Sequence, residues 1–168
     1  MPLNYNERML ALRFSALLAL VFWMGGLVAL GAIAAPATFD VLGARSEDGR
    51  ALAGAVFGET LRRFQTGAYL CGAVLIATLA ARAALGPRPR RVGLRMGITA
   101  AIVASAACTR LVMIPQIEEA LRTRLASPFA PGDDPRRAQF ARLHGLATSL
   151  QLVPVLGGLA LLLFELKD

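Results

Sequence analysis

The sequence contains few charged residues, a single histidine and only two cysteines. Charged residues make up 17% of its 168 positions, whereas a soluble domain has about 25%. Hydrophobic residues make up 56%. This composition argues against a soluble domain and is typical of a protein embedded in a membrane.

Arginine gives the chain its net charge of +7, because Lys167 is the only lysine among the 18 basic residues. The arginines lie in short clusters between apolar runs. Nucleic-acid binding would instead require a basic face with interleaved aromatic residues. Arginines that flank membrane spans explain the pattern better, so we expect the lipid bilayer, and no nucleic acid, as a partner.

The motifs of common enzymes are missing. The sequence has no GxSxG nucleophile motif, no phosphate-binding loop and no pair of carboxylates within an apolar run. These absences argue against a hydrolase or an ATP-driven pump. Cys71 and Cys108 both lie in apolar runs, so a disulfide framework is not indicated either.

Four segments are apolar over the ~20 residues that a membrane-spanning helix needs. They cover about residues 10–35, 66–85, 94–114 and 146–164. The first is longer than the roughly 7–15 apolar residues of a signal peptide, which favours a span. The sequence therefore predicts an all-α fold: a single four-span domain over residues 1–168 that forms an integral membrane four-helix bundle.

The distribution of charge predicts the orientation. The connection "GPRPRRVGLR" carries arginines and no acid, whereas acids and bases balance in the connections at about residues 37–65 and 115–144. Because arginine-rich loops stay in the cytoplasm, we expect a bacterial inner-membrane protein with both termini cytoplasmic. Apolar residues recur at helical spacing in the two long connections, which predicts helices that extend beyond the bilayer on the periplasmic side.

The two halves of the chain show a weak internal resemblance. The first and third spans each end near a proline, Pro36 and Pro115, that is followed by a polar amphipathic stretch. The second and fourth spans each follow an arginine-bearing helix. Asp134 is a suitable N-cap for the last of these, with Pro135 at its first position. The pattern is compatible with two stacked helical hairpins.

Small residues recur at intervals of four in the spans. Helices in lipid associate by close packing, which such residues permit. We therefore expect a tight bundle, and the same faces could also receive a membrane-protein partner or a second copy of the chain. A translocation path or a cofactor slot is the alternative. The sets are Gly25/Ala29, Gly31/Ala35, Gly67/Cys71, Ala68/Gly72, Ala73/Ala77 and Gly97/Ala101/Ser105.

Potential soft-metal ligands form one candidate site. Cys71 and Cys108 lie roughly 7–11 Å below the outer boundary of their spans, and Met113 and His144 lie nearer that surface. Thiolate, thioether and imidazole suit Cu(I). Cysteine is also a small packing residue, and a histidine at an interface can bond to a neighbouring loop, so structural roles are the alternative.

Polar residues near the outer surface form a second candidate site, for which we name Arg110, Arg142, His144 and Glu59. Arg110 is the charge placed deepest in a predicted span, and such charges usually face a partner or a wet cavity. Glu59, Glu118 and Glu119 are its candidate partners. Snorkelling to the interface is the alternative, as we expect for Arg13 and Arg82 at the other surface.

Pro154 lies within the fourth span, after Ser149 and Gln151. A proline inside a helix leaves a carbonyl without its donor and bends the helix. We expect either a kink that neighbouring helices fill or a polar notch in the bilayer interior.

The tract "FWMGGLVALGAIAAPATFD", with "AGAVFGETLRRF", "RLVMIPQI" and "RLHGLATSLQL", resembles the bacterial relatives of transmembrane protein 205 over about residues 10–160. The resemblance implies a four-helix membrane protein without a settled reaction. The eukaryotic relative is associated with resistance to platinum compounds, which makes metal handling or export a hypothesis. More distantly, the tract resembles four-helix membrane proteins of the copper-resistance D type and the haem-binding protoporphyrinogen oxidase. That oxidase uses a histidine in its first span, where this chain has none.

Two functional hypotheses follow. The first is a non-enzymatic inner-membrane protein without a cofactor, either a small transport or resistance factor or an accessory subunit of a membrane complex. The second is a membrane redox protein that binds haem through His144, or a soft metal such as copper through Cys71, Cys108 and Met113.

Overall fold

The computed structural model describes residues 4–45, 49–86, 89–125 and 135–167, which are helical apart from short turns. The helices are α1 (Tyr5–Ala29), α2 (Ala35–Gly43), α3 (Gly49–Leu85), α4 (Val92–Cys108), α5 (Ile114–Leu125) and α6 (Pro135–Leu166). Two π-helical turns, η1 (Leu30–Ala34) and η2 (Thr109–Met113), join α1 to α2 and α4 to α5. The start of α6 at Pro135 is confirmed, while its expected N-cap, Asp134, lies outside the described residues.

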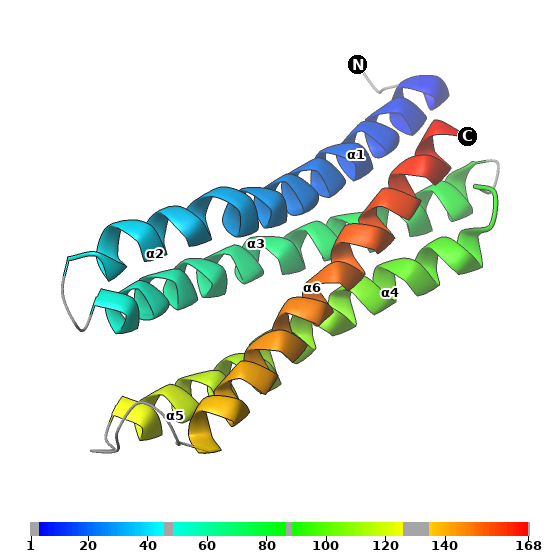
Figure 1. Cartoon of the computed structure of the whole chain (residues 1–168). Helices are drawn as coiled ribbons and strands as arrows, with labels where there is room; N and C mark the ends of the chain where they lie inside the picture. Colours follow the sequence, from blue (N-terminus) through cyan, green and yellow to red (C-terminus); the bar gives the residue numbers. More distant parts are fainter. Residues whose placement is uncertain (1–3, 46–48, 87–88, 126–134, 168) are drawn as a thin grey trace.

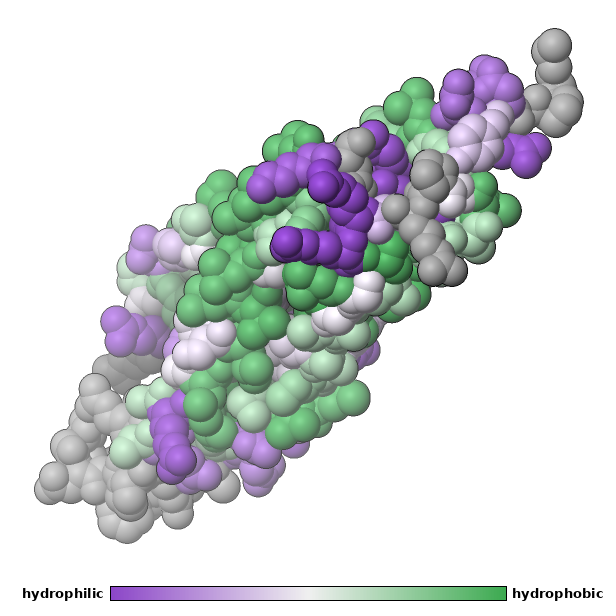
Figure 2. Space-filling view, turned by 90° about the vertical axis from the view of Figure 1, so that its right-hand side faces the viewer, coloured by the Kyte–Doolittle hydropathy of each residue, from purple (hydrophilic) through white to green (hydrophobic). Residues whose placement is uncertain are grey.

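Four stretches of the described chain are long and apolar enough to cross a membrane: Tyr5–Gly43, Gly49–Leu85, Val92–Ala120 and Ala141–Leu166. Many large apolar side chains on them are exposed in the isolated chain, including Phe14, Leu70, Leu111 and Leu156. Figure 2 shows such side chains over the middle of one face and hydrophilic ones toward the two ends. Apolar side chains suit contact with lipid. A helix can also lie in lipid because its backbone hydrogen bonds are made within the helix. The all-α, four-span membrane fold is confirmed.

The helices form two hairpins. α3 packs along α1 and α2, α6 packs along α4 and α5, and contacts of α3 with α4 and of α1 with α6 join the hairpins. Both termini and the α3–α4 connection lie at one end of the bundle, which we call the terminal end (Figure 1). The ends of α2 and α5 and the starts of α3 and α6 lie at the opposite end, which we call the loop end. This arrangement agrees with the internal resemblance between the halves of the sequence.

A π-helical turn followed by a proline occurs once in each hairpin. η1 ends two residues before Pro36, and η2 ends two residues before Pro115. A proline ring clashes with the carbonyl four residues earlier in an α-helix, and a wider π-helical turn moves that carbonyl away. The helices therefore continue past both prolines, where the sequence had suggested that the spans end.

The core surrounds Trp23 of α1, which is 3% exposed, and includes Leu20, Ala68 and Ile102. Gly72 of α3 permits this packing. A Cβ atom added at Gly72 would lie 2.7 Å from Val103 Cγ2 and 3.3 Å from Trp23 Cζ3. Close helix approach at small residues, predicted for Ala68 and Gly72, is thus confirmed there.

Other predicted small-residue faces do not pack within the described chain. No atom lies within 4 Å of a Cβ added at Gly25, Gly31 or Gly97. Instead Gly157 and Gly158 of α6 make the close approaches, since a Cβ there would lie 2.8 Å from Ile102 Cγ1 and 2.6 Å from Met24 Sδ respectively. The spacing of small residues alone did not tell which face of each helix turns inward.

Candidate functional site

Four charged side chains meet near the terminal end of the bundle. Arg13 comes from α1, Arg82 from α3, Arg95 from α4 and Glu165 from α6, and each arginine lies within ion-pair distance of Glu165. We call this group the Glu165 cluster. Because each spanning stretch contributes one side chain, the cluster links all four of them.

Glu165 is the centre of the cluster. Its Oε1 accepts hydrogen bonds from Arg82 Nη1 at 2.6 Å and from Arg95 Nη1 at 3.0 Å. Arg13 Nε lies 3.7 Å from Oε2. The side chains of Arg82, Arg95 and Glu165 are 8%, 2% and 8% exposed, whereas that of Arg13 is 39% exposed. Three members are therefore shielded from solvent, and only Arg13 reaches the surface.

Arginines also cap the C-terminal end of α6. Arg13 Nη2 donates to the carbonyl of Glu165 at 2.8 Å, and Arg95 Nη2 donates to that of Phe164 at 3.0 Å. The last four carbonyls of a helix accept no hydrogen bond from an N–H group four residues later in the helix, so these arginines supply donors that the helix lacks. The Arg95 guanidinium also lies 5.2 Å from the centre of the Phe164 ring, which is a cation–π distance. The end of α6 is thus bound to both α1 and α4.

A small cavity of about 20 Å³ adjoins the cluster and is lined in part by Arg82, Arg95 and Glu165. Glu165 Oε2 is buried and accepts no hydrogen bond from the described residues. The cavity has room for one water molecule, which can donate to this oxygen.

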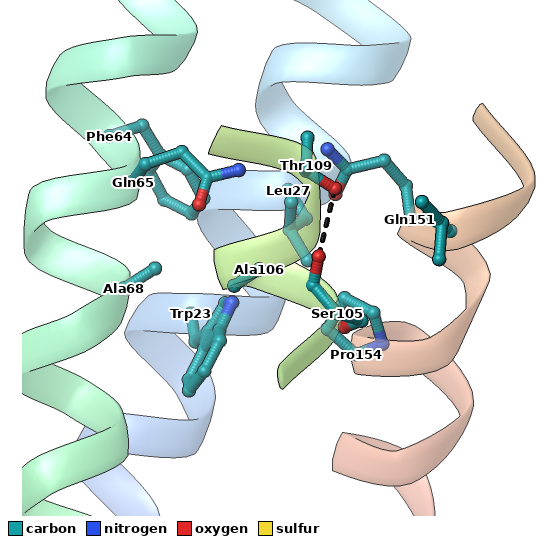
Figure 3. A pocket seen from close by; sticks show the side chains of 11 residues that line it. Trp23, Leu27, Phe64, Gln65, Ala68, Ser105, Ala106, Thr109, Gln151 and Pro154 are labelled. Atoms are coloured by element: carbon teal, nitrogen blue, oxygen red, sulfur yellow. Dashed lines mark hydrogen bonds between the residues drawn. The ribbon is translucent and has the colours of Figure 1, made fainter. Parts of the chain in front are cut away.

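A second cavity, of about 10 Å³, lies between the hairpins and is lined by residues of α1, α3, α4, η2 and α6. We call it the polar cavity. Gln65, Ser105, Thr109 and Gln151 contribute its polar groups, and Trp23 contributes its indole ring (Figure 3). Gln65 is 3% exposed, and its Oε1 is buried without a hydrogen-bond partner among the described residues. This volume also corresponds to about one water molecule.

The polar cavity lies away from the Glu165 cluster along the bundle. At about 1.5 Å per residue, Ser105 is roughly 15 Å from Arg95 along α4, and Gln65 is roughly 25 Å from Arg82 along α3. The apolar core of a bilayer is about 30 Å thick. The cavity therefore lies within the spanning stretches of the helices, well away from the terminal end.

A π-helical turn and a proline within a helix adjoin the polar cavity. Thr109 begins η2, and its Oγ1 donates to the carbonyl of Ser105 at 2.9 Å, the dashed line in Figure 3. Pro154 of α6 lines the same cavity beside Leu150 and Gln151. π-helical turns occur frequently at functional sites. The position of Pro154 favours the polar notch over a kink filled by apolar neighbours.

A network of charged groups lies beyond the polar cavity toward the loop end. Arg62 pairs with Glu59, and its Nη2 donates to Glu118 Oε1 at 2.5 Å, which ties α3 to α5. Arg110 Nη1 donates to Thr66 Oγ1 at 3.1 Å and to the Arg62 carbonyl at 3.3 Å. We call this the Arg62 network. It contains the expected residues Arg110, Glu59 and Glu118, but both acids pair with Arg62, while Arg110 bonds to neutral oxygens of α3.

The other members of the predicted outer site lie elsewhere. Arg142 and His144 occupy exposed positions on α6. Neither lines the polar cavity, whose wall from α6 is made by Leu150, Gln151 and Pro154. The structure therefore unites Arg110 with Glu59 in one network, while a site that they share with Arg142 and His144 remains a prediction.

The candidate metal ligands show no assembled centre in the described part of the chain. Cys71 is buried in the core and Cys108 is half-buried at the end of α4, and both are free thiols. Within the described ranges, no three histidine, cysteine, aspartate or glutamate side chains are grouped so as to hold a metal ion. A site formed by Cys71, Cys108, Met113 and His144 remains a prediction.

The sequence analysis missed three residues of the interior: Arg95, Glu165 and Gln65. A signal was present for Glu165, because this acid directly follows the apolar run "LALLLF" at the end of the last span. An ionisable residue at such a position usually has a partner. Arg95 gave no comparable signal, since it stands in a run of arginines.

A family model matches residues 18–126, which is more than half of the chain. The chain belongs to the DUF4149 family. That family is described as a domain of unknown function, in agreement with the kind of family that the sequence resembles. No curated protein and no solved structure matches the chain significantly. The likeness to transmembrane protein 205 and to the copper-resistance D type therefore remains a prediction.

The family match covers part of both sites. It includes Gln65, Arg82, Arg95 and Ser105 but ends before α6. Glu165 and Gln151, which complete the cluster and the cavity, lie outside the matched residues.

Proposed function

We propose that this member of the DUF4149 family is a non-enzymatic transport protein that moves a small polar solute along the interface between its two hairpins. The observation that carries the proposal is the Gln65 amide, whose buried Oε1 lines the polar cavity without a partner among the described residues. A buried polar group left unsatisfied costs about 1–3 kcal/mol. A solute that donates a hydrogen bond, or a cation, removes this cost.

The surroundings of the polar cavity support transport. Transporters commonly bind their solutes between structural repeats, near the middle of the bilayer, where helices are interrupted. Here η2 and Pro154 disturb the regular hydrogen bonding of two helices that line the cavity, although both helices run on without a break. The Arg62 network joins the hairpins on the loop side of the cavity, and the Glu165 cluster joins them at the terminal end. These two groups are suited to close the path on either side.

We further propose that the protein lies in a bacterial inner membrane with its terminal end in the cytoplasm. Arg90 and Arg91 are exposed in the short α3–α4 connection, and positive residues are retained on the cytoplasmic side. Transport toward the periplasm would make the protein a resistance factor.

The accessibility of a thiol in the polar cavity tests the proposal. We would replace Ser105 by Cys in a variant that also carries Cys71→Ala and Cys108→Ala, and reconstitute it in liposomes. Membrane-impermeant methanethiosulfonate reagents would be added outside or trapped inside. Ala104→Cys is the matched control, because Ala104 is an exposed neighbour on the same helix.

A transport path predicts that the thiol at position 105 reacts from both sides, in alternation, and that the thiol at position 104 reacts from neither because it faces lipid. Protection of the thiol at position 105 from both sides, or access from one side only, would contradict transport.

An accessory role in a larger assembly is the second candidate. α4 carries Gly93, Gly97 and Ala101 at intervals of four, and all three are exposed. No atom of the described residues lies within 4 Å of a Cβ added at either glycine, so this small-residue face suits close packing with another helix. Cross-linking in membranes would test for a second copy. Loss of the cross-linked dimer in Gly97→Leu but not in Ala73→Leu supports this candidate, and a monomer in all samples contradicts it.

A further inference from the structure

We propose that the solute of the polar cavity is a small monovalent cation of the size of Na⁺. This inference rests on the proposed transport function and names its substrate class. Three properties of the cavity support this assignment: its oxygen acceptors, the absence of carboxylates among its described lining residues, and its size.

The polar cavity presents oxygen acceptors from three elements, beside the N–H groups of Gln65, Gln151 and Trp23. The hydroxyl of Ser105 donates to the Ile102 carbonyl at 2.8 Å, and that of Thr109 donates to the Ser105 carbonyl at 2.9 Å. A hydroxyl that has donated its proton retains lone pairs. With Gln65 Oε1, these hydroxyls give oxygen acceptors from α3, α4 and η2 around one space.

The proline of α6 supplies a further acceptor. In a regular helix the N–H of residue 154 would donate to the carbonyl of Leu150, but Pro154 has no N–H. Leu150, Gln151 and Pro154 all line the polar cavity. The Leu150 carbonyl therefore lacks the donor that a regular helix would give it, and it can accept from or coordinate a bound species.

The lining residues favour a monovalent ion. Ca²⁺ and Mg²⁺ sites in proteins generally include carboxylates, and no carboxylate of the described residues lines this cavity. The cavity, of about 10 Å³, has room for one water-sized species, so a bulky organic cation such as choline does not fit.

Arg110 limits the affinity. It follows Thr109 directly in η2 and binds oxygens of α3, including Thr66 Oγ1 next to Gln65. Its positive charge opposes a second cation nearby. We therefore expect weak, millimolar binding, which is appropriate for an ion that must also leave.

The single tryptophan of the chain provides the measurement, because Trp23 lines the cavity itself. Purified full-length protein would be titrated with NaCl, KCl or NH₄Cl while choline chloride keeps the ionic strength constant, and Trp23 fluorescence would be recorded. We expect a saturable change with at least one of the three small cations and none with choline chloride alone.

Two variants make the test specific. Gln65→Leu removes an oxygen ligand and should weaken binding about tenfold or more, in line with the loss of one contact to a charged group. Gln116→Leu makes the same change at an exposed position of α5 and should leave the titration unchanged. The absence of a saturable response to all three cations, or an unaltered titration in Gln65→Leu, would overturn the proposal.

The thiol test separates this inference from the function on which it rests. If the thiol at position 105 is reached from both sides but no cation binds, the path exists and carries another solute. If a cation binds but the thiol is reached from one side only, the site is real and transport is not.

Discussion

Glu165 and Arg95 form an ion pair between residues 70 positions apart, with 3.0 Å between Oε1 and Nη1 and with both side chains almost fully buried. Arg82 shares the same carboxylate oxygen. A buried carboxylate that holds two guanidinium groups in place stabilises the fold only while all partners are present. The first predictions concern this dependence.

Glu165→Gln should strongly destabilise the protein. The amide keeps the size of the side chain but removes the charge that Arg82 and Arg95 share, and breaking a buried pair in this way costs about 3–5 kcal/mol. Thermal unfolding in detergent measures the effect. Asp40→Asn, an exposed change in α2, should shift the free energy of unfolding by less than about 0.5 kcal/mol. Equal unfolding temperatures for the two variants would show that the cluster is not structural.

Arg95→Lys should also destabilise, although it keeps the charge. Arg95 uses two nitrogens for two acceptors, Glu165 Oε1 and the Phe164 carbonyl, and its plane lies over the Phe164 ring. Lysine has a single side-chain nitrogen and cannot reproduce the two planar donors of arginine. Loss of one hydrogen bond to a charged group costs about 1.5–3 kcal/mol. Arg90→Lys at an exposed position is the control. A stable Arg95→Lys protein would mean that charge alone holds α6.

Gly72→Ala and Gly97→Ala should have opposite effects. The added Cβ meets Val103 and Trp23 at position 72 and nothing at position 97. Overpacking a core costs about 1–3 kcal/mol, whereas alanine in an open helical position gains about 0.5–1 kcal/mol over glycine. The difference between the two unfolding temperatures checks the packing, and a similar response at both positions would contradict it.

Glu118→Gln should make the polar cavity more accessible from the loop side. It removes the pair that ties Arg62 of α3 to α5. Both side chains are 43% exposed, so the pair is worth about 0.2–1 kcal/mol. The thiol of Ser105→Cys should accordingly react up to about fivefold faster from that side. Asp40→Asn, which also neutralises an acid but at an exposed position of α2, is the control, and an equal rate in both variants would show that the pair does not restrict access.

Much of the fold follows from the sequence because a helix that crosses a bilayer must be apolar over about 20 residues. Apolar runs of sufficient length predict the four spans, and the shared pattern around Pro36 and Pro115 predicts the two hairpins. The extent of the helices was less predictable. Proline normally interrupts a helix, but the π-helical turns before Pro36 and Pro115 allow α2 and α5 to continue.

The candidate site was harder to predict, since a sequence does not reveal which face of a helix turns inward. Arg110 and Glu59 were recognised because a charge deep in a span needs a partner. Arg13 and Arg82 were assigned to snorkelling, a sound default near a membrane surface. The four chain segments that carry the Glu165 cluster are distant in sequence, so only the packed bundle brings them together.

The most direct test of this account is the rate at which the thiol of Ser105→Cys reacts with a membrane-impermeant reagent from each side of a liposome, compared with that of Ala104→Cys. Transport between the hairpins predicts reaction at position 105 from both sides and protection at position 104. If the thiol at position 105 is as protected as the one at position 104, the bundle is closed and the polar cavity carries no solute.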